Sequence, residues 1–443
     1  MMRTPETPPA IPKALAGLGR AFEHPLDPVM AEVVAESQRR YRHWDKLRFV
    51  ASGRGLDPEM VWALVKAGRL ANRRPLPFRG MEGERFTYSV PDVAQRELML
   101  IDRQLAGLIG FDTQEPIPDA HKERFIRDSL MEEAISSSML EGAATTVRVA
   151  KEMLRTGRAP RTRGERMVAN NYRAIQFIRE NVRTPLSREF VIELQRILTT
   201  DTLDEPEHAG RFRKSDERVV VQDAYGEVLH EPPAAGELPA RIATLCRFAN
   251  ATPRTDEGFI HPVVRAIILH FQLAYDHPFC DGNGRTARAL FYWSMLRAGY
   301  WLFEFLPISR LIYQAPSKYA RAFLYTETDD LDCTYFVVYH LRLIGQARRD
   351  LADYLREKQR ELAEADTLFR RAPVNHRQRA LLAHAVRHPD TAYTIEAHKR
   401  SHGVAYGTAR SDLFGLERLG YLSRSKVGRM FEFRPTRKLS RRL

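Results

Sequence analysis

The chain of 443 residues contains only three cysteines, Cys246, Cys280 and Cys333. This odd and widely spaced set gives neither a disulfide framework nor the paired spacing of a zinc site. No apolar run approaches the roughly 18 residues that span a membrane, and the first residues lack the apolar core of an export signal. We therefore expect a cytoplasmic protein with no membrane association.

The net charge is small over most of the chain, because basic and acidic residues nearly balance there. The total net charge is +13, but residues 374–443 hold 15 Lys and Arg against 5 Asp and Glu, which places +10 of it in this segment. Any non-specific attraction for polyanions therefore belongs to the C-terminal part. The length allows two or three domains, each with its own core.

The most informative stretch is residues 277–288, HPFCDGNGRTAR, between two helical patterns at 263–275 and 286–297. The first pattern is apolar almost all round, which indicates a buried helix. Gly282 and Gly284 let the backbone approach a ligand closely, and the N–H groups that open the second helix attract an anion. The turn between the two helices is therefore predicted to bind phosphate.

The side chains of this turn indicate the same chemistry. Arg285 and Arg288 lie three residues apart in a first helical turn, where cations are unfavourable unless an anion lies between them. Asp281 is suited to Mg²⁺ shared with a nucleotide, because one carboxylate plus phosphate oxygens is a common magnesium site. His277 can accept a proton near neutral pH, as a general base must.

Taken together, these twelve residues resemble the Fic family signature H-x-F-x-[DE]-G-N-G-R-x-x-R at every fixed position. The resemblance implies transfer of AMP from Mg·ATP to a protein hydroxyl, with His277 as the base and Asp281 as the metal ligand. The implied nucleotide-binding residues are Asp281, Gly282, Asn283, Gly284, Arg285, Thr286, Ala287, Arg288 and, in a later helix, Tyr319. Near Tyr319, Ala320 and Glu327 replace a tyrosine and an asparagine of some family members, so the nucleobase contacts depart from that pattern.

Glu141 precedes a glycine that ends a helix beginning near Ala120. A carboxylate at that end meets the negative pole of the helix dipole and needs a cation, and Arg288 is the complementary one. The alternative is a solvated glutamate without a partner. Ser137, Glu141 and Gly142 resemble the family's inhibitory pattern [ST]-x-x-x-E-[GN]. The resemblance implies that Glu141 pairs with Arg288 and keeps the ATP γ-phosphate from its productive place.

Two β-prone runs, 218–222 and 227–230, surround a turn and predict a hairpin. By the same resemblance, this flap, about residues 217–231, holds a target segment on Val219, Val220 and Val221 by main-chain pairing. An ordinary surface hairpin is the alternative. Residues 73–88, broken by prolines and glycines, predict a loop, and residues 161–166 a basic connector.

The expected fold is mostly α. A helical N-terminal extension, 1–110, precedes a Fic-type core, 111–370, with its inhibitory helix at about 120–142. Residues 374–443 read as three helices, 376–387, 394–401 and 406–419, and a hairpin, which resembles a winged helix-turn-helix domain. Its candidate DNA contacts are Ala409, Arg410, Ser411, Arg418, Arg424, Lys426 and Arg429. A protein-binding winged helix is the alternative.

Three functions remain open from the sequence. The chain is an AMP transferase restrained by Glu141, or it removes AMP at the same site, or it is a DNA-binding regulator with a vestigial enzyme core. The first is favoured because the signature is intact. ATP and target proteins with a Ser, Thr or Tyr acceptor are the expected partners. The sequence leaves the identity of the target and a homodimer open.

Overall fold

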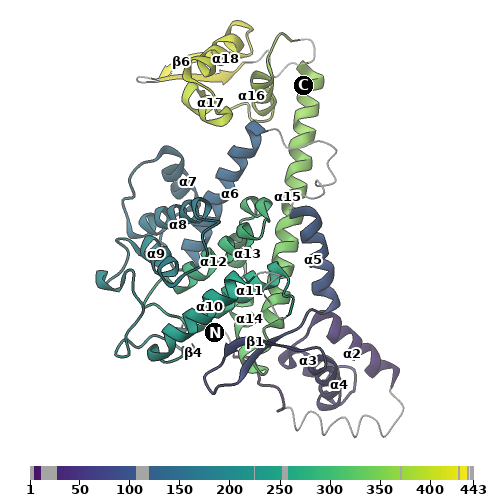
Figure 1. Ribbon diagram of the computed structural model, residues 1–443. Coiled ribbons are helices and arrows are strands. Elements are labelled where there is room, and N and C mark those ends of the chain that lie inside the picture. The colour runs from purple at the N-terminus through teal and green to yellow at the C-terminus, as the bar shows by residue number, and fades with distance from the viewer. Residues whose placement is uncertain are drawn as a thin grey trace. The chain divides into compact units, whose positions relative to one another are not determined.

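The computed structural model describes residues 4–10, 27–105, 119–223, 225–251, 258–369, 372–427, 430–436 and 439 (Figure 1). The described residues are mostly helical, which confirms the predicted fold class. The chain divides into two compact units, Met1–Ile109 with Leu130–Ala347, and Gly110–Ser129 with Arg348–Leu443. No helix in the described ranges is both long enough and apolar enough to cross a membrane.

The first unit is built around helices. They are α2 (Pro28–Arg40), α3 (Trp44–Ser52), α4 (Pro58–Leu70), α5 (Asp92–Leu105), α7 (Val147–Thr156), α8 (Arg163–Glu180), α9 (Arg188–Thr199), α10 (Leu238–Asn250), α11 (Pro262–Asp276), α12 (Asn283–Arg297), α13 (Ile308–Gln314) and α14 (Pro316–Thr328). Three 3₁₀ turns, η1 (Pro206–His208), η2 (Ala235–Glu237) and η3 (Trp301–Phe305), join them. Helices α6 (Asp119–Leu140) and α15 (Thr334–Phe369) contribute residues to both units.

Helices α11 and α12 form the centre of this unit. Nearly every residue of α11 is buried, as its apolar sequence predicts. The two helices pack along each other, α10 packs on α11, and α8 and α9 cover α12 (Figure 1). Helix α12 begins at Asn283, three residues earlier than predicted, because Gly282 takes φ 86° and serves as its N-cap. The short connection between the two helices therefore lies at the middle of the unit.

The predicted loop at residues 73–88 is wrong. It is an antiparallel hairpin of β1 (Arg74–Arg79) and β2 (Arg85–Tyr88). Leu76 and Phe78 are buried between exposed neighbours, so the strand alternates inward and outward despite its prolines. Prolines are tolerated here because the sheet has only two strands, and its edges leave backbone positions without ladder bonds.

The predicted flap hairpin is present but shorter than expected. Its strands are β3 (Val221–Gln222) and β4 (Val228–His230), with Val221 opposite His230. Val219 and Val220 precede the paired segment and lie outside it. The basic connector predicted at 161–166 is also wrong in part, because α8 already begins at Arg163, with the Thr162 hydroxyl as its N-cap acceptor.

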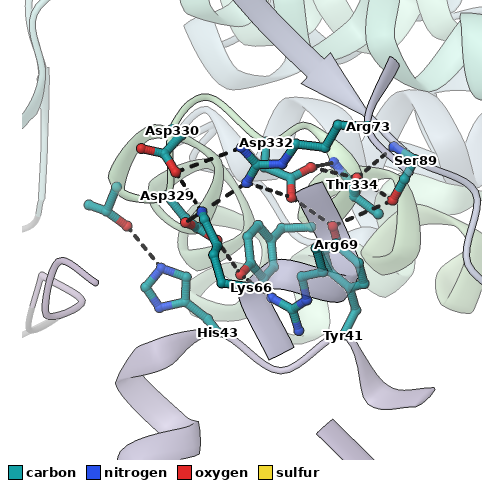
Figure 2. Close-up of polar contacts among 12 residues, drawn as sticks. Tyr41, His43, Lys66, Arg69, Arg73, Ser89, Asp329, Asp330, Asp332 and Thr334 are labelled. Carbon is teal, nitrogen blue, oxygen red and sulfur yellow. Dashed lines mark hydrogen bonds and ion pairs between the residues drawn. The ribbon is translucent and has the colours of Figure 1, made fainter. Parts of the chain in front are cut away.

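The N-terminal helices of this unit join α14 and α15 through buried charges (Figure 2). Lys66 of α4 pairs with Asp329, and both side chains are 1% exposed. Asp332 accepts hydrogen bonds from the Tyr41 hydroxyl at 2.6 Å and from Arg73 at 3.3 Å. Cations on one side of this contact thus face carboxylates on the other, as buried charges require.

The C-terminal part of the second unit contains α16 (His376–Arg387), α17 (Ile395–His402) and α18 (Tyr406–Arg418), close to the predicted helices. Its antiparallel sheet has the order β5-β7-β6, formed by β5 (Tyr393–Thr394), β6 (Leu422–Val427) and β7 (Met430–Pro435). The sequence analysis missed β5, which is only two residues long. Ala409 is wrong as a DNA-contact candidate, because it is fully buried in the core of this part. Arg429 lies outside the described residues.

Candidate active site

His277 is the residue at which α11 ends. It takes the left-handed conformation, with φ 44° and ψ 57°, and its N–H donates to Leu273 O. Its ring Nδ1 lies 3.0 Å from Ala274 O, and a carbonyl can only accept, so Nδ1 carries the hydrogen and Nε2 keeps its lone pair. Burial lowers the pKa of His277 to about 4. The imidazole is therefore neutral at pH 7 and able to take a proton.

The loop after His277 is braced by its own side chains. Asn283 bonds both main-chain groups of Phe279, accepting from N at 2.9 Å and donating to O at 2.7 Å. The Thr286 hydroxyl donates to Gly282 O at 2.8 Å. Outside the loop, Gln195 donates to Asp281 O at 3.1 Å. These bonds leave the Asn283 and Thr286 side chains occupied, so any phosphate contact from these residues would come from the main chain.

Glycine is required at both loop positions. A Cβ on Gly282 would lie 2.8 Å from Thr199 Cγ2, and its φ of 86° is unfavourable for other residues. A Cβ on Gly284 would overlap Oε1 of Glu141 and lie 3.1 Å from a guanidinium nitrogen of Arg288. The Glu141 carboxylate thus rests against the first turn of α12. This is the place where the helix N-terminus attracts an anion.

Arg288 holds the carboxylate there. One of its terminal nitrogens, Nη2, lies 2.9 Å from Glu141 Oε1 and donates to Ser137 O at the same distance. Its Nε donates to the Ser137 hydroxyl at 2.9 Å. The Arg288 side chain is 5% exposed and that of Glu141 is 28% exposed. The structure therefore contains the Glu141–Arg288 pair expected from the sequence, with Ser137 as a further acceptor.

The end of α6 orients Glu141. Gly142 N donates to Met139 O and Ala143 N donates to Ser138 O, both at 3.1 Å. These two bonds form a Schellman motif, in which Glu141 is the C-cap and Gly142 takes the left-handed position with φ 82°. The glycine allows the chain to turn immediately after Glu141, so the carboxylate can face α12.

The sequence predicted that Arg285 and Arg288 surround one anion. In the structure, Arg285 instead binds groups of the protein. Its side chain is 1% exposed and donates to Leu198 O and to Asp281 Oδ1, both at 3.1 Å. Asp281 Oδ1 also accepts from Gly282 N at 2.5 Å. The Asp281 side chain is 44% exposed, and no described residue donates to its Oδ2. A half-exposed carboxylate with one oxygen still available fits Mg²⁺ shared with phosphates.

Ala287 and Tyr319, two other residues predicted to bind the nucleotide, lie in different environments. Ala287 is fully buried and contributes to the helix core. The Tyr319 hydroxyl lies 2.8 Å from His270 Nε2, and burial raises the pKa of Tyr319 to about 12. Tyr319 is half-buried and interacts electrostatically with Arg288 and Glu141. Tyr319 therefore lies near the Arg288–Glu141 pair.

Residues 185–295, which contain α9 to most of α12, match the family model described as the Fic/DOC family. The chain therefore contains a Fic/DOC-like segment. The chain is similar over 250 residues, at 26% identity, to a protein named protein adenylyltransferase Fic from Nematostella vectensis. That alignment covers 54% of this chain and 54% of the relative, so the chain spans about half the length of the relative.

A second relative of the chain, protein adenylyltransferase Fic from Drosophila yakuba, is 35% identical over 96 residues. The match covers 22% of this chain and 17% of the fly protein. Among solved structures, a variant of a Fic-1 fragment from C. elegans aligns with a TM-score of 0.50 and 17% identity. It covers 79% of this chain and 98% of the fragment, and at this identity it supports the fold alone.

The sequence analysis did not predict two residues, Gln195 and Arg213, that hold the loop after His277. Gln195 joins Asp281 O to Gly210 N, which donates to Gln195 Oε1 at 2.7 Å. Arg213 Nε donates to His277 O at 2.9 Å, and its NH₂ group donates to Pro233 O. The available signal for Gln195 was a polar residue on the buried face of α9. Arg213 lies in irregular chain, where periodicity gives no signal.

Proposed function

We propose that this chain transfers AMP from ATP to a hydroxyl group of a protein, and that Glu141 restrains the reaction. The observation that carries the proposal is the Glu141 carboxylate bound by Arg288 against Gly284, beside a neutral His277. An acidic side chain occupies a position that favours an anion, and a base lies at the adjoining helix end. The names of the two relatives support the same reaction.

In the proposed step, the target hydroxyl attacks the α-phosphorus of ATP. Its oxygen forms a bond to phosphorus, the bond from the α-phosphorus to the bridging oxygen breaks, and pyrophosphate leaves. His277 Nε2 accepts the hydroxyl proton, while the Nδ1 bond to Ala274 O fixes the ring. The nearby triphosphate charge raises the proton affinity of the imidazole, which burial lowers.

The phosphates are proposed to lie at the N-terminus of α12, where the main-chain N–H groups face them. Asp281 would hold Mg²⁺, which supplies charge neutralisation on the phosphates. When Glu141 withdraws, Arg288 becomes available to the γ-phosphate. Restraint then follows from competition, because one guanidinium cannot hold the carboxylate and the phosphate in the same place.

The test uses Glu141→Gly and the double variant Glu141→Gly/His277→Ala, incubated with ATP labelled at the α-phosphate and a cell lysate. Mass spectrometry then maps the modified residues. We expect label on Ser, Thr or Tyr with the single variant and its loss with the double variant. Label that persists without His277 would contradict the proposed base. Release of AMP from labelled target on addition of the wild-type chain would favour the reverse reaction instead.

We also propose that residues 374–443 form a winged helix that binds DNA. Asp412 of α18 is 3% exposed and joins the three helices, accepting from Arg377 at 2.7 Å and from Asn375 at 2.7 Å, with His398 at 3.1 Å. The opposite face of α18 exposes Arg410, Ser411 and Arg418, and β6 exposes Arg424 and Lys426. Basic residues on one helix and one strand are the pattern of groove and phosphate contacts.

A gel-shift titration of the whole chain against chains lacking residues 374–443 tests this second proposal. Binding is expected to weaken steeply with salt, and to weaken further in Arg410→Ala, because each phosphate contact releases counterions. Asp390→Ala, in the loop after α16, is a matched control that removes a charge of the opposite sign. Binding that survives the truncation would contradict the assignment.

A further inference from the structure

His230, the last residue of β4, connects the flap hairpin to two helices of the first unit. Its Nδ1 lies 2.7 Å from Glu327 Oε2 of α14, and its Nε2 lies 2.8 Å from Tyr275 O of α11. The His230 side chain is 9% exposed and that of Glu327 is 21% exposed. His230 is also the Cα partner of Val221, a residue predicted to face the target. The contact therefore fixes both strands of the hairpin near its base.

The protonation of this contact follows from its acceptors. A carbonyl oxygen can only accept, so Nε2 must carry a hydrogen. A carboxylate is also an acceptor, so the 2.7 Å contact at Nδ1 needs a second proton between the imidazole and Glu327. The geometry is thus that of an imidazolium paired with a carboxylate. Without that proton, the Nδ1 lone pair would face the carboxylate oxygen, and the contact would become repulsive.

The charged and titratable groups around His230 agree with this assignment. Glu327 comes from α14, Tyr275 and Asp276 from α11, and His277 follows α11; Arg241 of α10 reaches Asp276 at 3.2 Å. Burial lowers the pKa of His230, but Glu327, the Tyr275 carbonyl and Asp276 together outweigh it, and the net shift is upward. The positive His230 in turn lowers the pKa of His277, which helps to keep that imidazole neutral.

We propose that the His230–Glu327 pair is a positioning contact that holds the flap hairpin, residues 217–231, against α11 and α14 while a target segment pairs with it. The role of the flap in target binding rests on the proposed AMP transfer, whereas the His230–Glu327 contact itself does not depend on that reaction. Since the contact needs the second proton, the hairpin is held firmly at low pH and is released as the pH rises through the titration of His230. His230 acts here through the flap and has no contact with the reacting atoms.

Two variants separate the need for the second proton from the presence of the hydrogen bonds themselves. In Glu327→Gln the amide can donate to the lone pair of a neutral His230, so the contact no longer needs the second proton. The hairpin of this variant should stay held at every pH. His230→Ala removes both bonds and should leave the hairpin loose at every pH. Glu231→Ala is the matched control, because Glu231 directly follows β4 and its exposed side chain pairs with exposed Arg218 at 3.5 Å.

The experiment is amide hydrogen exchange of the full chain by mass spectrometry, between about pH 6 and about pH 9. Rates of peptides from 217–231 are divided by their intrinsic rates at each pH. Wild type and Glu231→Ala should lose roughly tenfold in protection as the pH rises, the effect of one charge-assisted hydrogen bond. Glu327→Gln should show no such loss, and His230→Ala should show low protection throughout. Wild-type protection that does not change with pH, or equal protection in His230→Ala, would overturn the proposal.

A second measurement tests the use of the flap. In the Glu141→Gly background, His230→Ala should raise the KM for a protein target by roughly tenfold, with kcat changed much less. An equal fall in kcat at unchanged KM would overturn the positioning role. If the chain transfers no AMP at all, the exchange experiment still decides whether the pair holds the hairpin, so the two proposals fail separately.

Discussion

His277 shows how a single residue acquires a role from its position at a helix end. The left-handed conformation turns the chain out of α11, and the Nδ1 bond to Ala274 O fixes the ring. Burial then lowers the pKa of His277 to about 4. The sequence predicted the residue as a base, but the tautomer and the direction of the pKa shift required coordinates.

This shift predicts how stability depends on pH. The folded pKa of His277, about 4, lies below the ordinary 6.5, so the unfolded chain binds a proton more readily as the pH falls between these values. His277 should therefore cost about 2 kcal/mol of unfolding free energy between about pH 7 and about pH 5. Denaturant unfolding at both pH values should show a smaller loss in His277→Ala. An equal loss in both proteins would contradict a buried neutral imidazole.

Arg285 and Arg288 show what spacing could not decide. Both lie in the first turn of α12, and the sequence placed them around one anion. Leu198 O, which α9 brings next to α12, accepts a hydrogen bond from Arg285. The Ser137 hydroxyl of α6 accepts one from Arg288. Helical spacing tells which residues share a helix face, but it cannot tell which neighbouring elements supply carbonyl groups there.

At the scale of secondary-structure elements, the C-terminal end of α6 sets the direction of the Glu141 side chain. Its Schellman motif was predictable only as a glycine stop, because the two backbone bonds depend on the left-handed Gly142. The β1–β2 hairpin was missed for the opposite reason. Its prolines and glycines concealed the alternation of Leu76 and Phe78 with exposed residues. The longer helices were predicted well, because their apolar residues recur with the helical period.

Gly142→Ala tests whether the Schellman motif at the end of α6 positions Glu141. An alanine at φ 82° costs about 1 kcal/mol, so the turn should shift and move the Glu141 carboxylate away from Arg288. Gly157→Ala is the matched control, because Gly157 caps α7 at φ 71° with no atom near the added Cβ. Thermal unfolding should show similar losses in both variants, and only Gly142→Ala should label with AMP faster than wild type. Equal labelling rates in Gly142→Ala and wild type would show that the helix cap does not contribute to the restraint.

On the scale of the whole first unit, a buried ionic contact joins α4 to the connection between α14 and α15 (Figure 2). Composition could not predict it, since surface and buried charges look alike in a sequence. Lys66, Asp329 and Asp332 are each at most 1% exposed, while the Asp330 side chain is 43% exposed. Removing one partner of a buried pair leaves the other charge uncompensated.

Asp332→Ala should therefore lower the unfolding free energy by about 3 to 5 kcal/mol. Asp330→Ala is the control in the same loop and should cost less than about 1 kcal/mol, because solvent screens its pairs with Lys66 and Arg73. Urea unfolding followed by circular dichroism measures both. Equal losses would show that burial of these charges does not decide their contribution.

In the proposed function, the charge of Glu141, held by Arg288, restrains the reaction. The most direct measurement is the initial rate of AMP incorporation by wild type, Glu141→Gly and Glu141→Gln with labelled ATP. We predict that Glu141→Gly is faster than wild type by one to two orders of magnitude, about 1.4 to 2.8 kcal/mol of bias against the productive nucleotide pose, with Glu141→Gln between them. Rates equal to wild type in both variants would contradict the account.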